Sequence, residues 1–181
     1  MKKQIFISHT WKHDSQGRDT HDRARHLKHA LEKLGWSVWF DETDMYGNID
    51  AAMANGIDNC SVVVFCLTRA YFENIENAVN TSKLSNCLKE WNYSQIRNKL
   101  SLPILFEPEL CDLNEWPAGV ISMTFGRSLY VDASVCIDRA TRKVHQQLRA
   151  HGLTPVHGIH KWNSIRSRFR RGKKFPVEIT L

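Results

Sequence analysis

The segment Cys60-Ser61-Val62-Val63-Val64-Phe65-Cys66-Leu67 is the most apolar in the chain, and it indicates the type of fold. A continuous apolar run rich in β-branched residues is typical of a strand that is buried on both faces of a parallel sheet. A shorter run of the same kind, Ile5-Phe6-Ile7, lies near the start of the chain. We therefore expect residues 60–67 to form the central strand and residues 5–7 to form a second buried strand.

The other expected elements alternate along the chain. An apolar stripe predicts a helix over residues 22–34, which Gly35 ends, and residues 36–40 form the next strand. The remaining predictions are helices over 49–58, 83–98 and 134–149, strands over 102–106 and 128–131, and polar loops over 9–20 and 41–48. One helix of the alternation is missing or irregular, because residues 107–126 show no clean period. The pattern predicts an α/β, flavodoxin-like three-layer fold with a five-stranded parallel sheet.

Three polar loops are expected to meet at one edge of this sheet. They begin at His9, Asp41 and Thr68, each directly after a predicted strand. Ligands of open parallel sheets bind outside the carboxyl ends of the strands, where connections diverge to opposite faces. The helix over residues 83–98 is expected to follow the third strand, so its residue Glu90 should lie at the same edge.

Glu90 is expected at the margin of the apolar stripe of its helix. That stripe consists of Leu84, Cys87, Leu88, Trp91 and Gln95. Leu88 and Trp91 should anchor the helix in the core, and Glu90 can then face a cleft without entering the core. The alternative role for Glu90 is that of a solvated helix carboxylate.

Three segments resemble the Toll/interleukin-1 receptor (TIR) domain family, over roughly residues 1–149. The first family box is matched by Ile5-Phe6-Ile7-Ser8-His9, with Asp14 in the following loop. The second is matched by Gly35-Trp36-Ser37-Val38-Trp39-Phe40-Asp41 and by the loop over residues 42–49. The segment Ser85-Asn86-Cys87-Leu88-Lys89-Glu90-Trp91 resembles the cysteine-x-x-glutamate signature of enzymatic TIR domains, although Asn86 stands where that signature often has tryptophan.

The resemblance implies cleavage of NAD⁺ at the nicotinamide–ribose bond. The products would be nicotinamide and ADP-ribose, a cyclic ADP-ribose isomer or an ADP-ribose conjugate that acts as an immune signal. NAD⁺ is then a substrate, and no cofactor is expected. The resemblance makes Glu90 the catalytic carboxylate, since one carboxylate can stabilise an oxocarbenium-like transition state. It implies substrate-binding roles for seven residues: Ser8, His9, Trp11, Asp41, Tyr46, Ile49 and Cys87.

Some side chains also suit particular parts of NAD⁺. Trp11, Trp39 and Tyr46 are candidates for stacking on nicotinamide or adenine, although Trp39 lies in a predicted strand and is favoured as a core residue. Lys12 and Arg18 are candidate donors to the pyrophosphate. The resemblance also implies self-association through TIR–TIR contacts, and the loop over residues 41–49 is the usual contact region. In organisation the chain is similar to the free-standing TIR proteins of bacterial Thoeris-type antiphage defence, so a separate effector activated by the product is a further expected partner.

Two other functional classes remain open. A non-enzymatic TIR adaptor would act by TIR–TIR assembly alone. A nucleic-acid-binding protein would use the end of the chain, where the entire net charge of +6 is located. We therefore divide the chain into a TIR domain over residues 1–150 and a basic C-terminal extension over residues 151–181. A solvated extension is favoured over a nucleic-acid site.

No metal site, phosphate loop or membrane segment is predicted. His9 and His13 are four residues apart and Asp14 is adjacent, but this spacing is weak evidence for a metal site because the segment is predicted to be a loop and not a helix. Neither a P-loop nor a dinucleotide-binding glycine motif is present. The chain has five cysteines without a paired CxxC motif, which favours free thiols and a cytoplasmic location. Its longest apolar run is far shorter than the roughly 18 residues of a membrane span.

Overall fold

The computed structural model describes residues 3–83 and 85–156 of the chain. The predicted TIR domain therefore lies almost entirely within the described part. The predicted basic C-terminal extension lies outside it from residue 157 onward, as does Leu84.

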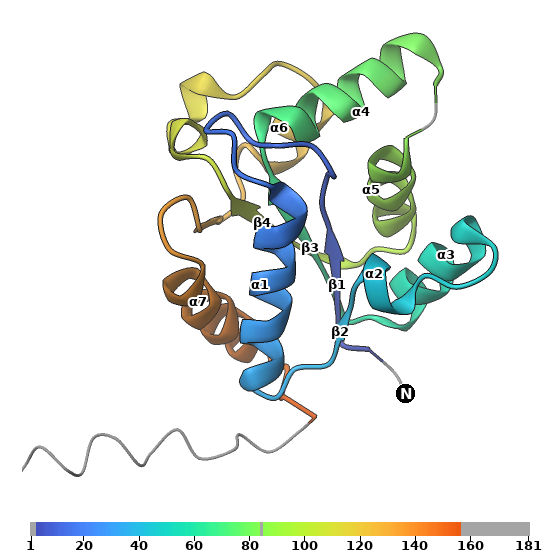
Figure 1. The fold of residues 1–181 in the computed structure, drawn as a ribbon, viewed down its shortest axis with the longest axis vertical. Coiled ribbons are helices and arrows are strands. Elements are labelled where there is room, and N and C mark those ends of the chain that lie inside the picture. Colours follow the sequence, from blue (N-terminus) through green and yellow to red (C-terminus); the bar gives the residue numbers. More distant parts are fainter. Residues whose placement is uncertain (1–2, 84, 157–181) are drawn as a thin grey trace, which may run out of the picture.

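The centre of the molecule is a sheet of five parallel strands (Figure 1). Its strands are β1 (Ile5–Ser8), β2 (Val38–Trp39), β3 (Val62–Leu67), β4 (Leu100–Leu105) and β5 (Val131–Asp132), in the order β2-β1-β3-β4-β5. Every residue of β3 is buried, as expected for a strand covered on both faces. The prediction of an α/β fold with a five-stranded parallel sheet is confirmed.

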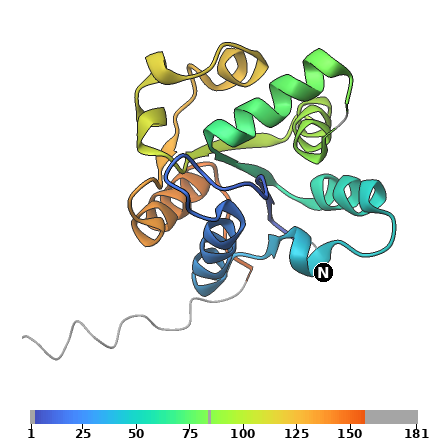
Figure 2. The ribbon, with the colours of Figure 1, turned by 45° about the horizontal axis from the view of Figure 1, so that its top comes forward.

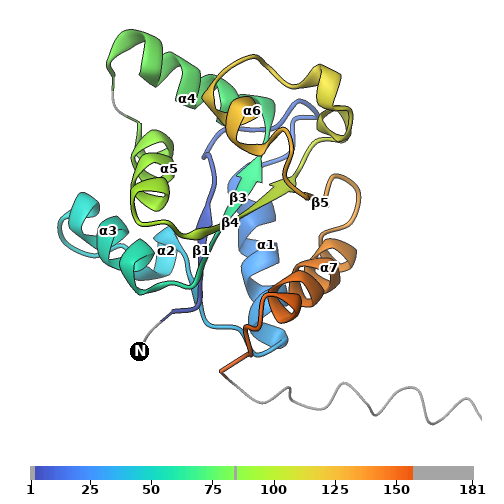
Figure 3. The same ribbon diagram turned by 180° about the vertical axis from the view of Figure 1, so that it is seen from behind.

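Helices cover both faces of the sheet, and the alternation of side chains along β1 and β3 divides the core between them. Ile5, Ile7, Val62 and Val64 pack under α1 (Thr20–Lys33) and α7 (Ile137–Ala150). On the other face, Phe6 and Val63 pack under a layer that contains α3 (Ile49–Asn59), α4 (Arg69–Thr81), α5 (Asn86–Ile96) and α6 (Val120–Phe125). Figures 1 and 3 show these two layers on opposite sides of the strands.

The largest difference from the sequence-based prediction is a helix directly after β3. No element was predicted there, yet α4 occupies residues 69–81 and buries Tyr71, Phe72, Ile75 and Ala78. The expectation that the helix of Glu90 directly follows the third strand is therefore wrong, because α5 is the second helix after β3. That helix begins at Asn86 rather than near residue 83, since the Ser85 side chain accepts a hydrogen bond from the Leu88 backbone N–H at 3.1 Å.

Smaller differences concern the loops. The predicted loop over residues 41–48 begins with a short helix, α2 (Asp41–Asp44). Residues 107–126 are irregular, as expected, and contain two short 3₁₀ helices, η1 (Pro108–Cys111) and η2 (Leu113–Glu115), before α6. These loops, together with the ends of α4 and α5, surround the carboxyl end of the strands, which is turned forward in Figure 2.

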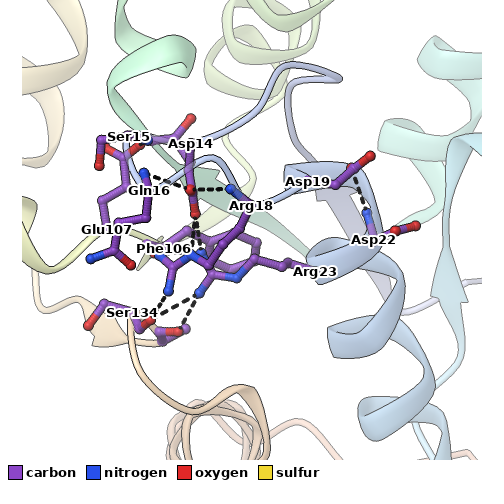
Figure 4. A network of polar contacts seen from close by, with 12 residues as sticks. Asp14, Ser15, Gln16, Arg18, Asp19, Asp22, Arg23, Phe106, Glu107 and Ser134 are labelled. Atoms are coloured by element: carbon purple, nitrogen blue, oxygen red, sulfur yellow. Dashed lines mark hydrogen bonds and ion pairs between the residues drawn. The ribbon is translucent and has the colours of Figure 1, made fainter.

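A buried ion-pair network fastens the β1–α1 loop over the sheet (Figure 4). The Asp14 carboxylate accepts hydrogen bonds at 2.7 Å from both Arg18 and Arg23. The two guanidinium groups also donate to backbone carbonyls at the ends of β4 and β5, at Phe106, Ala133 and Ser134. Burial alone would raise the pKa of Asp14, but the hydrogen bonds and charge of Arg18 outweigh it and hold the pKa below its ordinary value.

Glu107 makes a second attachment of this loop. Its carboxylate is fully buried and accepts a hydrogen bond from the backbone N–H of Ser15 and another from that of Arg69, both at 2.7 Å. The β1–α1 loop is thus tied at one point to the start of α4 and at another to the ends of β4 and β5. This attachment fixes the direction in which the first residues of the loop, 9–12, leave the sheet.

We predict that Asp14→Asn destabilises the domain by about 3 kcal/mol at pH 7, because it leaves two guanidinium groups without their buried carboxylate. Urea unfolding followed by circular dichroism measures this difference. The matched control is Asp22→Asn, which removes an exposed carboxylate bound to Arg25 and should cost less than about 1 kcal/mol. Equal stabilities of the two variants would contradict the assigned role of the network.

Candidate active site

Glu90 lies in the interior, at the carboxyl end of β1. Glu90 is only 7% exposed, and its Oε2 atom accepts a hydrogen bond from the Ser8 hydroxyl at 2.6 Å. The same Ser8 oxygen lies 2.8 Å from the hydroxyl of Tyr71 on α4. Glu90 was expected to face a cleft from the margin of the apolar stripe without entering the core. It is instead buried, because α4 and β1 enclose that side of α5, and the alternative of a solvated helix carboxylate is wrong. Trp91, expected as a core anchor, is instead only partly buried.

Burial changes the acidity of this carboxyl group. Loss of hydration raises the pKa of Glu90 to about 8, the Ser8 hydrogen bond opposes this rise, and the negative charge of Asp41 adds to it. Within residues 3–83 and 85–156, no Lys or Arg side chain forms an ion pair with Glu90. The carboxylate is therefore held without a protein counter-ion, as is common for functional carboxylates in clefts.

Glu90 lines a cavity of about 510 Å³, a size suited to a small-molecule ligand. The β1–α1 loop, the β2–α2 junction, α4 and α5 all contribute to its wall. The lining residues are His9, Thr10, Trp11, Lys12, Asp41, Glu42, Met45, Asn74, Asn86, Cys87 and Glu90. A second cavity, of about 420 Å³, lies between α3 and α5, and Glu90 contributes to its wall as well.

The structure brings together most of the residues considered from sequence. His9, Trp11, Asp41 and Cys87 line the same cavity as Glu90. Ser8 lies behind the carboxylate, fully buried, and acts on the cavity only through its hydrogen bond to Glu90. Cys87 also contacts the first loop, since its thiol lies 3.4 Å from the backbone oxygen of His9.

Other candidates lie elsewhere. Tyr46 and Ile49 are 78% and 49% exposed and do not line the cavity within the chain. Trp39 is a core residue that stacks on Phe6, which agrees with the favoured alternative. Arg18 was considered as a pyrophosphate donor, but its guanidinium is occupied by Asp14 and two backbone carbonyls.

Several lining residues were not predicted. Asn74 could not be found because α4 itself was missed. Glu42, Met45 and Asn86 carry no motif that separates them from ordinary loop and helix residues. His21 does not line the cavity and was not among the predicted site residues, but its ring stacks on Trp11 with centroids 3.8 Å apart. Its position at the start of α1 is the only sequence signal that places it near the first loop.

A polar cluster joins the two loops at the cavity rim. The Trp11 indole N–H donates to Asp41 Oδ2 at 2.9 Å, and His9 Nε2 lies 2.7 Å from His21 Nδ1. Burial lowers the pKa of His9 to about 4, while the nearby charge of Asp41 partly opposes this effect. These contacts hold the Trp11 side chain in place, although Trp11 is 65% exposed.

The sheet order, the two helical layers and a carboxylate at the carboxyl end of β1 define a parallel α/β domain with a ligand-sized cavity at its switch point. Residues 5–139 match the family described as TIR domain, which is more than half of the chain, so the protein belongs to the TIR domain family. The resemblance noted from the sequence is thereby confirmed at the level of the family.

A similar solved structure is the TIR domain of the Toll-related receptor TRR-2 from Hydra magnipapillata. It is 17% identical to this chain, with a TM-score of 0.52, and the match covers 80% of this chain and 97% of that one. At this identity the likeness shows the fold alone. No curated protein matches the chain. Within the described residues, no helix has the length and apolar character needed to cross a membrane.

We predict that Glu90→Gln stabilises the folded protein at alkaline pH. The carboxyl pKa is raised from 4.5 to about 8 by folding, so the folded state holds its proton more tightly and loses relative stability as pH rises between these values. The glutamine variant does not titrate and should melt roughly 5–10 °C above the original protein near pH 9. The difference should shrink towards pH 4.5, the ordinary value for this group.

Thermal unfolding across this pH range, followed by circular dichroism, measures the effect. Glu73→Gln is the matched control, because Glu73 is an exposed carboxylate on α4 and should give no pH-dependent gain. A glutamine variant at position 90 that is less stable at every pH would show that the carboxylate is not destabilised by its burial.

Proposed function

We propose that this TIR domain cleaves NAD⁺ at the bond between nicotinamide and ribose, with Glu90 as the catalytic carboxylate. The observation that supports this proposal is the buried Glu90 side chain, hydrogen-bonded to Ser8, in the wall of a cavity of about 510 Å³. The segment that supplies this side chain resembles the cysteine-x-x-glutamate signature of enzymatic TIR domains. Members of the family that act only by assembly do not need a desolvated carboxylate at this position.

The chemistry requires little more than one negative charge. When the bond between C1′ of the ribose and the nicotinamide nitrogen breaks, both electrons leave with nicotinamide, which departs as a neutral molecule. The ribose is left as an oxocarbenium-like cation, which the Glu90 carboxylate stabilises. Water then adds to C1′ and releases a proton, giving ADP-ribose. If an atom of the ADP-ribose or of another acceptor adds instead, a cyclic isomer or a conjugate is formed.

The positive charge of the substrate also completes the electrostatics of the site. Glu90 has no Lys or Arg counter-ion among the described residues, and its ionised form is disfavoured by burial. A nicotinamide ring carrying a positive charge supplies the missing counter-ion and stabilises the ionised carboxylate. In a desolvated cavity this attraction is much stronger than in water. The same feature therefore favours substrate binding and keeps Glu90 in its reactive state.

The rim of the cavity provides groups for the rest of NAD⁺. Trp11 offers an exposed indole face on which a nicotinamide or adenine ring can stack. Lys12 lines the cavity beside it and can donate to the pyrophosphate. His9, Asp41 and Cys87 complete the wall, and Ser8 acts as a positioning residue for Glu90. We place the protein in the cytoplasm, where NAD⁺ is available and where its five free thiols remain reduced.

Self-association is part of this proposal. Tyr46 and Ile49 lie near one another in the chain, are well exposed and do not reach the cavity of their own chain. Large exposed apolar side chains of this kind suit a protein–protein contact. We assign them to a TIR–TIR contact in which the loop between α2 and α3 approaches the site of a neighbouring chain. The product would act as an immune signal on a separate effector, as in Thoeris-type systems.

A second candidate function is that of a non-enzymatic TIR adaptor. The same exposed Tyr46 and Ile49 favour it, because assembly through these residues does not depend on catalysis. The two functions are separated by incubating the purified protein with NAD⁺ and measuring free nicotinamide.

We predict that Glu90→Gln lowers the rate of nicotinamide release by about a hundred- to thousandfold, because it removes the charge that stabilises the oxocarbenium-like state. Chromatography of nicotinamide formed at saturating NAD⁺ measures this rate. Glu73→Gln, the exposed control on α4, should keep the original rate. Near-normal turnover by a folded Glu90→Gln protein would overturn the assignment of Glu90.

The pH dependence gives an independent check of the same assignment. Because the carboxylate must be ionised, kcat/KM should rise with pH until it levels off above about pH 8, the raised pKa of Glu90 in the free protein. A profile that is flat between pH 6 and pH 9 would point to a different group.

We also predict that activity depends on assembly. Specific activity should rise with protein concentration, and Tyr46→Ala with Ile49→Ala should lower it at a given concentration without changing the melting temperature. Nicotinamide release and sedimentation velocity on the same samples measure both quantities. Met123→Ala is the control, since this side chain is 90% exposed on α6, away from the loop between α2 and α3. Constant specific activity from a species that sediments as a monomer would contradict the prediction.

A further inference from the structure

His9, His21 and Asp41 come together from three separate elements. They lie at the end of β1, at the start of α1 and at the start of α2. One nitrogen or oxygen atom from each residue falls within 4.8 Å of the corresponding atom of the other two. The separations are 2.7 Å between the two imidazole nitrogens, 3.7 Å from His9 Nε2 to Asp41 Oδ2, and 4.0 Å from His21 Nδ1 to Asp41 Oδ1.

We propose that these three side chains bind a divalent transition-metal ion of the zinc type, through His9 Nε2, His21 Nδ1 and a carboxylate oxygen of Asp41. Two imidazole nitrogens and one carboxylate are a ligand set that suits such ions, and three protein ligands leave one coordination position open. Because His9 and Asp41 line the large cavity, the open position faces that cavity. No metal site was predicted from the sequence. The set also differs from His9, His13 and Asp14, whose spacing was considered and not favoured, and the Asp14 carboxylate is engaged in ion pairs with Arg18 and Arg23.

The distances are compatible with an ion. Bonds of about 2.0–2.1 Å in a tetrahedral arrangement place the ligand atoms about 3.3 Å apart. The three separations in the protein lie on both sides of this value, so the imidazole nitrogens must move apart by roughly 0.6 Å and one oxygen of Asp41 must approach both of them. Side-chain rotations are sufficient for such shifts.

Neighbouring groups are arranged as they are around metal ligands. His21 directs Nδ1 to the proposed site, while its other nitrogen, Nε2, lies 3.8 Å from the Glu42 carboxylate. A carboxylate behind the second nitrogen of a ligating histidine fixes its tautomer and orientation. The Trp11 indole N–H donates to Asp41 Oδ2 at 2.9 Å and restrains the third ligand in the same way.

The negative charge of Asp41 also favours the binding of a cation. Within the part of the chain that the structure describes, the Asp41 carboxylate lies within 4.0 Å of the two imidazoles and forms no ion pair with Lys or Arg. The nearby Glu42 is neutralised by Arg25, whose Nε lies 2.8 Å from its carboxylate. Asp41 therefore keeps an uncompensated negative charge next to two imidazole nitrogens, and a divalent ion would neutralise it.

A bound ion would change the cavity that also contains Glu90. The cavity wall contains three carboxyl groups, those of Asp41, Glu42 and Glu90, and one ammonium group, that of Lys12. An ion with an open coordination position would give the rim a positive centre able to accept a phosphate oxygen. This consequence for NAD⁺ rests on the proposed function, whereas metal binding itself does not.

The direct test is isothermal titration calorimetry of the untagged full-length protein with zinc chloride in a non-coordinating buffer. We expect one ion per chain at this site, and affinity reduced about a hundredfold or more by His21→Gln and by Asp41→Asn. The matched control is His29→Gln, which removes an exposed histidine from the same helix as His21 and should leave the affinity unchanged. Titration with Co²⁺ should produce visible d–d absorption in the original protein and not in His21→Gln.

Magnesium chloride serves as a second control, because a hard oxygen-preferring ion should not compete with zinc at a site with two imidazoles. Circular dichroism shows whether each variant is folded, and Asp41→Asn provides the test if His21→Gln does not fold. Equal zinc affinity in the original protein, Asp41→Asn and His29→Gln would overturn the proposal, as would an absence of zinc binding up to millimolar concentration. Since calorimetry needs no NAD⁺, a protein that binds zinc but releases no nicotinamide would refute only the proposed function.

Discussion

The parallel pairing of β1 with β3 is the constraint on which the two core layers and the cavity depend. Its register places Ser8 opposite Phe65 at the carboxyl end of both strands. Because side chains alternate along each strand, this single register divides the core between the α1–α7 face and the face covered by α3 to α6. It also leaves the Ser8 hydroxyl at the point where Glu90 on α5 and Tyr71 on α4 meet it.

This arrangement has a cost in stability. A carboxyl group at this position is more stable when protonated, because α4, α5 and β1 remove it from water and, among the described residues, only the Ser8 hydroxyl donates to it. The network around Asp14 shows the opposite solution, since two guanidinium groups compensate that buried carboxylate. These two buried acidic groups therefore differ in character. One fastens a loop, and the other remains available to a cationic ligand.

The sequence allowed the sheet to be predicted because buried parallel strands are continuous apolar runs, as in residues 60–67. It did not reveal α4, because a helix that buries Tyr71, Phe72, Ile75 and Ala78 presents Glu73, Asn77 and Asn80 on its other side and so looks like a polar connection. The burial of Glu90 was not predicted for the same reason, since α4 supplies Tyr71 beside Ser8. The contact between His9 and His21 could not be predicted from the sequence either, because it depends on how the loop between β1 and α1 folds back onto α1.

The carboxyl groups in the cavity wall favour a positively charged ligand. Asp41 raises the pKa of Glu90, so the two carboxylates repel each other through the cavity they share. A neutral ligand would leave this repulsion unchanged, whereas a positive charge placed between them relieves it and gains from both carboxylates. A nicotinamide ring beside Glu90 and a metal ion beside Asp41 would each supply such a charge. Either ligand would thus lower the repulsion that opposes ionisation of the other carboxylate.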